Sequence, residues 1–234
     1  MTCKFVKHFT GKNMDKRFFG ELFFNRLFNE FTPQIIDVDK KLRSIFFKKI
    51  KTSKFSYIDS YNIGKLLATV HNRCCLVIGV WPQNIMQKYK PFPEIDSQLS
   101  LLQKEIKKIR VGFIHGDFRL RNILKDGQKL LFTDWEYAGI NFVYWDLAIF
   151  IGDLRHQQYH KKHLDLSVKE FLNGYSCINH LTKNEIRFIM KLGGYDIVLD
   201  HLSPEITEKN PIPATLFKRF NAKEEKYLLD ANIM

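Results

Sequence analysis

The order of the polar residues between His115 and Asp134 constrains this chain more than any other feature of its sequence. Asp117 is followed five residues later by Asn122, and the apolar run Leu130 to Phe132 then leads to Asp134. An apolar stretch precedes each acidic segment, as expected of short buried strands that end at polar loops. A magnesium-dependent phosphoryl-transfer site presents a base and two metal ligands in this order.

The residue types also suit phosphoryl transfer. The reaction needs an acceptor hydroxyl held in line and metal ions that neutralise charge on the phosphates. Magnesium prefers oxygen ligands and keeps several waters, so Asn122 and Asp134 are predicted to bind the metal. Asp117 is predicted to accept the proton of the acceptor hydroxyl or to orient that hydroxyl. We expect His115 to brace the loop.

Each part of the pattern is uninformative alone, because an Asp-x-x-x-x-Asn spacing is common in loops and an Asp such as Asp134 can simply end a strand. The joint order is much harder to obtain by chance, and it favours a kinase-like fold. The catalytic loop of protein kinases has the same spacing from Asp to Asn, with a second Asp at the end of a separate strand.

The His-Gly-Asp-x-x-x-x-Asn motif at 115–122, together with Asp-Trp-Glu-Tyr-Ala-Gly at 134–139, resembles the aminoglycoside phosphotransferase and choline/ethanolamine kinase family. Protein kinases have Arg in place of Gly116, and Phe-Gly after the metal-binding Asp. The resemblance implies an α+β, protein-kinase-like fold with two lobes, a β-rich N-terminal one and a larger, mainly helical C-terminal one. It also implies ATP as phosphoryl donor, Mg²⁺ as cofactor, a small alcohol as acceptor, and a supporting role for Asp146.

The N-terminal segment predicts a nucleotide-binding ion pair. Residues 4–9 alternate like a strand, and residues 18–28 read as an amphipathic helix. Kinases use a strand lysine, held by a helix glutamate, to contact the nucleotide phosphates, and Lys7 with Glu21 would fill these roles. Lys4 is the rival lysine on the same strand. The alternative is an exposed strand lysine and a solvated helix glutamate.

The remaining pattern divides the chain into two lobes, predicted as residues 1–52 and 53–234. Residues 33–39 and 42–50 read as a hairpin, after which the chain crosses to the second lobe near residues 50–55. Only six residues precede Lys7, so the first lobe is predicted to be truncated. Either the nucleotide is covered differently, or the given start is late, or the chain is a fragment. Helices are expected at 57–71, 95–109, 142–154, 168–175 and 184–201.

Composition agrees with a globular enzyme. The chain has 234 residues, 45% of them hydrophobic, and no apolar run long enough to span a membrane or serve as a signal peptide. The four cysteines form no Cys-x-x-Cys pair, which is simplest in a reduced, cytoplasmic setting. The net charge of +12 comes from scattered lysines without a nucleic-acid motif, so nucleic acid is not predicted as the main partner.

The acceptor is the least determined part of the prediction. A site for a cationic alcohol such as choline, ethanolamine or thiamine, or for an aminoglycoside, could use the acidic residues Asp153, Asp196, Asp200 and Glu205. An aromatic cage for a quaternary ammonium could use Trp81, Trp135, Trp145 and Tyr144, although core packing is the more common role of aromatics. The triplet His156, His160 and His163 is interpreted as part of a solvated basic helix. A catalytically weak binding module with a kinase fold stays the alternative to an enzyme.

Overall fold

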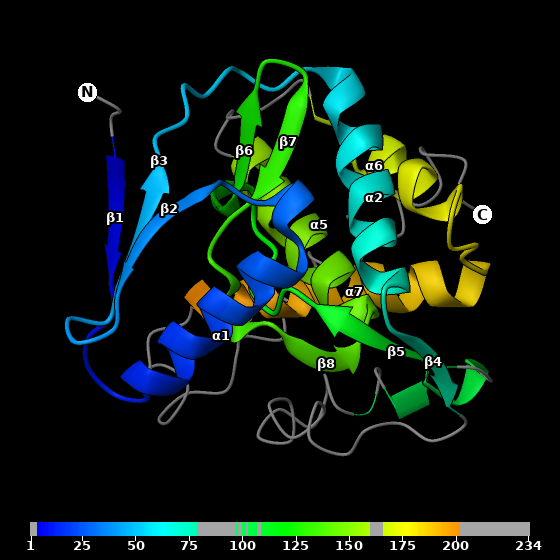
Figure 1. The fold of residues 1–234 in the computed structure, drawn as a ribbon. Coiled ribbons are helices and arrows are strands. Elements are labelled where there is room, and N and C mark those ends of the chain that lie inside the picture. The colour runs from blue at the N-terminus through cyan, green and yellow to red at the C-terminus, as the bar shows by residue number, and fades with distance from the viewer. Residues whose placement is uncertain are drawn as a thin grey trace.

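The computed structural model describes residues 4–78, 97, 100–101, 103–106, 109–159 and 166–201. Its first element is a three-stranded antiparallel sheet of strands β1 (Lys4–His8), β2 (Ile35–Asp39) and β3 (Ser44–Lys48), in the order β1-β3-β2 (Figure 1). Lys7 on β1 lies opposite Ile45 on β3. The strand and the hairpin expected from the sequence both form.

Helix α1 (Met14–Leu27) joins β1 to β2 and packs on both halves of the molecule. Phe18 and Leu22 pack with Ile45 and Phe47 of β3 in a small hydrophobic cluster. Two residues after Leu22, Phe24 belongs to the large core, where its ring stacks against Trp135. The helix therefore connects the sheet to the rest of the fold. A short 3₁₀ turn, η1 (Asn29–Phe31), follows it.

Two further small sheets form the centre of the chain. Strands β4 (Cys75–Ile78), β5 (Ile109–Ile114) and β8 (Gly139–Phe142) pair in the order β4-β5-β8. Strands β6 (Ile123–Asp126) and β7 (Lys129–Phe132) form a hairpin, which lies between β5 and β8 in the sequence. The 3₁₀ turns η3 (Leu120–Asn122) and η4 (Trp135–Tyr137) precede and follow this hairpin. The predicted catalytic motifs lie at these strand ends.

Four helices complete the described part of the larger half: α2 (Tyr57–Asn72), α5 (Tyr144–Tyr159), α6 (Val168–Ser176) and α7 (Lys183–His201). Helix α2 packs along α6, and α5 packs along α7 (Figure 1). In the expected helix at 95–109, residues 97, 100–101 and 103–105 are helical, but Ile109 is the first residue of β5. Among the described helices, none is long and apolar enough to cross a membrane.

The crossover between the two halves is held by backbone and by a buried ion pair. The amide of Ser53 donates to the carbonyl of Lys125 on β6 over 2.8 Å. The ammonium of Lys125 in turn lies 2.7 Å from the carboxylate of Asp59, and both side chains are buried. Asp59 and Ser56 also form the capping box that begins α2, so one carboxylate fixes both the helix start and the hairpin.

Candidate active site

The loop that follows β5 requires a glycine. Gly116 has φ +84°, in the left-handed region, and a Cβ built on it would lie 2.3 Å from the carbonyl oxygen of Tyr137. Any larger residue would be strained and would collide with that backbone. The close approach brings the loop after β5 against the turn η4.

Asp146, in the first turn of α5, holds this loop by its backbone. Its carboxylate accepts hydrogen bonds from the amides of His115 (2.6 Å) and Gly116 (2.9 Å), and it is fully buried. The ring of His71 on α2 lies 3.1 Å from the same carboxylate and 2.9 Å from the hydroxyl of Tyr175. These contacts are the ones that the predicted supporting role of Asp146 requires. His71 carries no motif, and the sequence did not indicate it.

The ring of His115 joins the two segments predicted to be catalytic. Its Nε2–H donates to the carbonyl of Thr133 over 2.8 Å, and the ring packs against Trp135 with 4.7 Å between centroids. Thr133 also donates its amide to the carbonyl of Asn122 over 2.9 Å. The segments that carry Asn122 and Asp134 are therefore neighbours.

Asp117 lies within a ring of donors. Arg119 Nε is 2.8 Å from Oδ1, while Arg121 and Asn122 each donate to Oδ2 over 3.0 Å. Burial raises the pKa of this carboxyl, but hydrogen bonds and charges from Arg121 and Arg119 outweigh it, so the pKa lies below its usual value. Asp117 is thus ionised at neutral pH and well placed to hold a hydroxyl group.

Lys7 connects the sheet to the second catalytic segment. Its ammonium lies 3.0 Å from Glu21 of α1, pairs closely with Asp134, and is 3.7 Å from Glu136. Burial lowers the pKa of Lys7, but the charges of Glu21 and Asp134 outweigh it and leave the pKa raised. The rival Lys4 instead lies over the ring of Phe46, 5.8 Å from its centroid.

Glu21 and Asp134 are both held in unusual settings. Glu21 is 1% exposed, which raises the pKa of its carboxyl, and Asn25 donates to its Oε1 over 2.8 Å. Asp134 has φ 69°, a left-handed conformation that is uncommon outside glycine.

The bidentate pair between Arg17 and Glu136 fixes α1 to the turn after Asp134, with distances from 2.9 to 3.1 Å. Sequence reasoning missed both members of that pair.

A cavity of about 470 Å³ gathers the predicted nucleotide- and metal-binding residues, whereas Asp117 is not part of its lining, and this volume is in the range of small-molecule sites. Its polar lining includes Lys7, Glu21, Arg121, Asn122 and Asp134. Its apolar lining comes from both halves of the fold, namely Phe5 of β1, Phe47 of β3, Ile50 of the crossover and Leu124 of β6.

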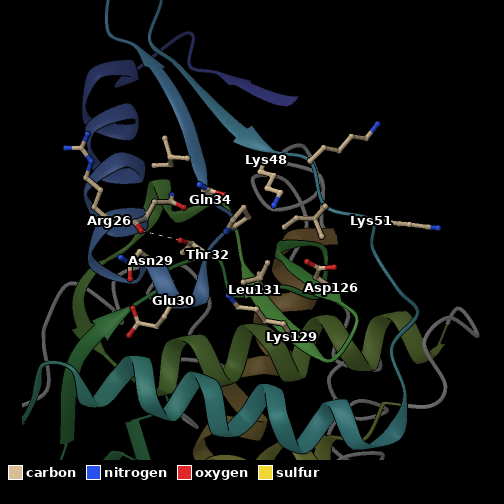
Figure 2. A pocket seen from close by; sticks show the side chains of 15 residues that line it. Arg26, Asn29, Glu30, Thr32, Gln34, Lys48, Lys51, Asp126, Lys129 and Leu131 are labelled. Atoms are coloured by element: carbon tan, nitrogen blue, oxygen red, sulfur yellow. Dashed lines mark hydrogen bonds between the residues drawn. The ribbon is translucent and has the colours of Figure 1, made fainter. Parts of the chain in front are cut away.

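A second cavity, of about 980 Å³, adjoins the first and shares Asn25, Pro33 and residues 48–50 with it (Figure 2). Lys48 and Lys129 extend toward its interior from the end of β3 and from the start of β7. The predicted catalytic and metal-binding residues do not line it.

Several candidates for the acceptor site have other roles. The Asp153 carboxylate accepts from the amide of Leu120 over 2.8 Å and so supports the catalytic loop. Trp135 and Tyr144 are fully buried, and Trp145 packs against the same core, as expected of core aromatics. Trp81, His160, His163 and Glu205, and the side chains of Asp196 and Asp200, lie outside the described residues. His156 lies in α5.

Comparison with known proteins agrees with this geometry. Residues 84–178 match the family model described as "Phosphotransferase enzyme family". The chain is 29% identical over 175 residues to a "Protein LicA homolog" of Metamycoplasma hominis, which covers 67% of this chain and 69% of that protein.

Solved structures share the fold at low sequence identity. The crystal structure of choline kinase LicA from Streptococcus pneumoniae has a TM-score of 0.58 and 14% identity, covering 98% of this chain and 85% of that chain. An amicoumacin kinase in complex with AMP-PNP and Ca²⁺ has a TM-score of 0.50 and 14% identity, covering 96% and 81%. The protein-kinase-like α+β fold predicted from the sequence is confirmed by these similarities.

Proposed function

Because residues 84–178 match the phosphotransferase enzyme family and the chain is similar to a LicA homologue, we propose that it transfers the γ-phosphoryl group of ATP to a hydroxyl of a small cationic alcohol, with Mg²⁺ as cofactor. The observation that carries the proposal is the convergence of Lys7, Asn122 and Asp134 on one cavity. These residues come from two distant parts of the sequence. Their side chains supply the cation and the oxygen ligands that a bound nucleoside triphosphate needs.

The cavity suits a nucleotide. Its apolar members, which include Phe5, Phe47 and Leu124, would enclose the base, and the backbone of the crossover would provide hydrogen bonds to it. Lys7, held by Glu21, would contact the phosphates. The complex of the amicoumacin kinase with AMP-PNP supports this assignment, because that protein has a similar fold and binds a nucleotide analogue.

The donor set fits Mg²⁺. Asn122 and Asp134 offer one amide oxygen and one carboxylate, and Mg²⁺ completes its six ligands with water and nucleotide phosphates. When bound, the metal would neutralise charge on the β- and γ-phosphates. The chain's own contribution is to place these two side chains beside each other through the hydrogen bond between Thr133 and Asn122.

Asp117 would hold the acceptor. Its lowered pKa makes it a weak base, so its main task is to orient the hydroxyl in line with the γ-phosphorus. In a loose transition state the hydroxyl loses its proton late, and Asp117 then accepts it. A choline-like alcohol is the first candidate because both the LicA homologue and the choline kinase LicA structure are similar to this chain.

The test is ligand stabilisation followed by turnover. Thermal unfolding of the full chain is measured with ATP, with and without Mg²⁺, beside Asp134→Ala. At a concentration of 100 times Kd, Mg-ATP should stabilise the wild type by about 2.7 kcal/mol, and the variant should lose this effect.

Turnover is then measured with choline, ethanolamine, thiamine and an aminoglycoside as acceptors, following the release of ADP. Phosphorylation of at least one cationic alcohol, abolished in Asp117→Ala, is expected. Nucleotide binding without turnover on any acceptor would contradict the enzymatic role and favour a binding module instead.

A further inference from the structure

Arg121 belongs to the loop that carries Asp117 and Asn122, and its long cationic side chain contacts Asp117. The same residue also lines the cavity of about 470 Å³. Its guanidinium donates to Asp117 Oδ2 over 3.0 Å, and the residue lines the cavity together with Lys7 and Asp134. Its side chain is 69% exposed, so packing does not hold it in place. Arg121 is therefore able to change partner.

Both oxygens of Asp117 are occupied in this structure. Arg119 donates to Oδ1, while Arg121 and Asn122 share Oδ2. A carboxylate has about four acceptor positions, and three are already filled, so an acceptor hydroxyl that approaches Asp117 crowds its donors and favours movement of the one that packing holds least. Asn122 is 5% exposed and the side chain of Arg119 is 18% exposed. Arg121, the most exposed of the three, loses least by moving.

The negative charge on the transferred γ-phosphoryl group would give the Arg121 guanidinium a second partner besides Asp117. In the described residues, the other cations that line the cavity are Lys7, Lys48 and Lys49. Lys7 is already paired with Glu21 and Asp134, and the other two lie at the end of β3 and directly after it. Arg121 lies one residue from Asn122 and in contact with Asp117, where the γ-phosphoryl group would sit.

We propose that Arg121 is a catalytic residue that leaves Asp117 when the acceptor binds and pairs with the transferred γ-phosphoryl group. This inference rests on the proposed function. In the free chain the guanidinium neutralises Asp117, and in the complex it neutralises the equatorial phosphoryl oxygens. Guanidinium groups suit such a site because their planar fork matches phosphate oxygens.

The step balances without any further reactant. The acceptor oxygen forms a bond to the γ-phosphorus while the bond between that phosphorus and the β–γ bridging oxygen breaks. ADP leaves with the electron pair of the broken bond, and the hydroxyl proton passes to Asp117. The phosphoryl group carries its negative charge through the transition state, and Arg121 is the cation that stabilises it there.

The experiment compares Arg121→Gln and Arg121→Lys with the wild type on an acceptor that the wild type phosphorylates. Removal of a transition-state contact should lower kcat by about 10²–10³-fold with little change in the KM for ATP. The Lys variant should be intermediate, because it keeps the charge but loses the fork. Affinity for Mg-ADP with aluminium fluoride, a mimic of the transferred group, should fall in parallel with kcat, whereas affinity for Mg-ATP should stay within about twofold.

Arg187→Gln is the matched control, because Arg187 is a half-exposed arginine on α7 whose ion pair is with Glu105. It should leave both affinities and kcat unchanged. If Arg121→Gln retains wild-type kcat and wild-type affinity for the aluminium fluoride complex, the inference is wrong while the proposed function stands. If the wild type itself does not bind Mg-ATP, the proposed function fails first, and the two failures are distinct.

Discussion

At the scale of single residues, the arginines around Asp117 set the pKa of its carboxyl group. Because Arg121 and Arg119 depress the pKa of this carboxyl, Asp117 stays ionised until the pH falls through a value below its usual range. The profile of kcat/KM reports the free protein. Arg121→Gln should therefore move the acid limb of kcat/KM to higher pH, which a pH–rate series from about pH 3 to about pH 8 would detect. An unchanged limb would mean that Asp117 does not control it.

Substitution of Gly116 tests how much of the destabilisation comes from backbone strain and how much from contact of the new Cβ with Tyr137. Gly116→Ala combines a left-handed residue with a Cβ placed 2.3 Å from the Tyr137 carbonyl. The expected loss is about 3–5 kcal/mol of unfolding free energy, the sum of backbone strain and overpacking, together with loss of activity.

Gly127→Ala is its control, because Gly127 also has a positive φ of +61° but no atom within 4 Å of the built Cβ. This substitution should cost only about 1–2 kcal/mol of backbone strain and leave activity intact. Urea unfolding of both variants decides the point. Equal losses would show that the contact with Tyr137 is unimportant.

At the scale of elements, the buried pair between Lys125 and Asp59 fixes the β6–β7 hairpin to the start of α2. Burial raises the pKa of Asp59, but hydrogen bonds from Lys125 and Ser56 outweigh it, and the pKa is lowered. The stability that the carboxylate contributes is thus present above its unfolded pKa and is lost as the pH falls through the folded one.

Lys125→Met should destabilise the chain by about 3–5 kcal/mol at neutral pH, because it leaves a buried carboxylate without its cation. The difference from wild type should shrink below about pH 4, where Asp59 is protonated in both the variant and the unfolded chain. Lys129→Met, at an exposed position of the same hairpin, should change stability by less than about 0.5 kcal/mol. Urea unfolding across this pH range measures the difference, and a loss that is independent of pH would contradict this account.

The elements themselves were largely predictable, although the apolar periodicity is strong in α6 and weak in α1 and α5. Helix α2 begins at Tyr57 as expected, and Ser56 and Asp59 form a capping box at its start. Helix α1 instead begins at Met14, four residues before the predicted Phe18. Its first turn is polar except for Met14, so periodicity could not indicate it. Arg17 stabilises that turn through Glu136, more than a hundred residues away.

At the scale of the whole molecule, the cavity proposed to bind the nucleotide has walls from both halves of the chain. Phe5 and Phe47 come from the sheet, while Asn122 and Asp134 come from the catalytic segments. A bound Mg-nucleotide should therefore slow hydrogen exchange in β1 and β3 and in residues 115–134 together, and Asp134→Ala should show neither effect. Protection limited to one of the two regions would contradict the proposed binding mode.

The site residues that were predictable from the sequence differ from the others in how far apart they lie along the chain. His115, Asp117, Asn122 and Asp134 lie close together in the sequence, and their spacing carries the chemistry. His71 and Asn25 support the site from helices far away in sequence, and their types and positions fit any ordinary amphipathic helix. Such residues gain their role only through tertiary packing, which a single sequence does not reveal.

The contact between Lys7 and Asp134 also has a kinetic consequence. Asp134 is the carboxylate expected to bind the metal, and in this structure the Lys7 ammonium already occupies it. Free Mg²⁺ must then compete with a cation that belongs to the protein itself. A nucleotide that arrives already complexed to Mg²⁺ removes the conflict, because its phosphates give Lys7 another anion. We therefore expect ordered binding, in which the metal enters with the nucleotide and the protein without nucleotide has little affinity for Mg²⁺.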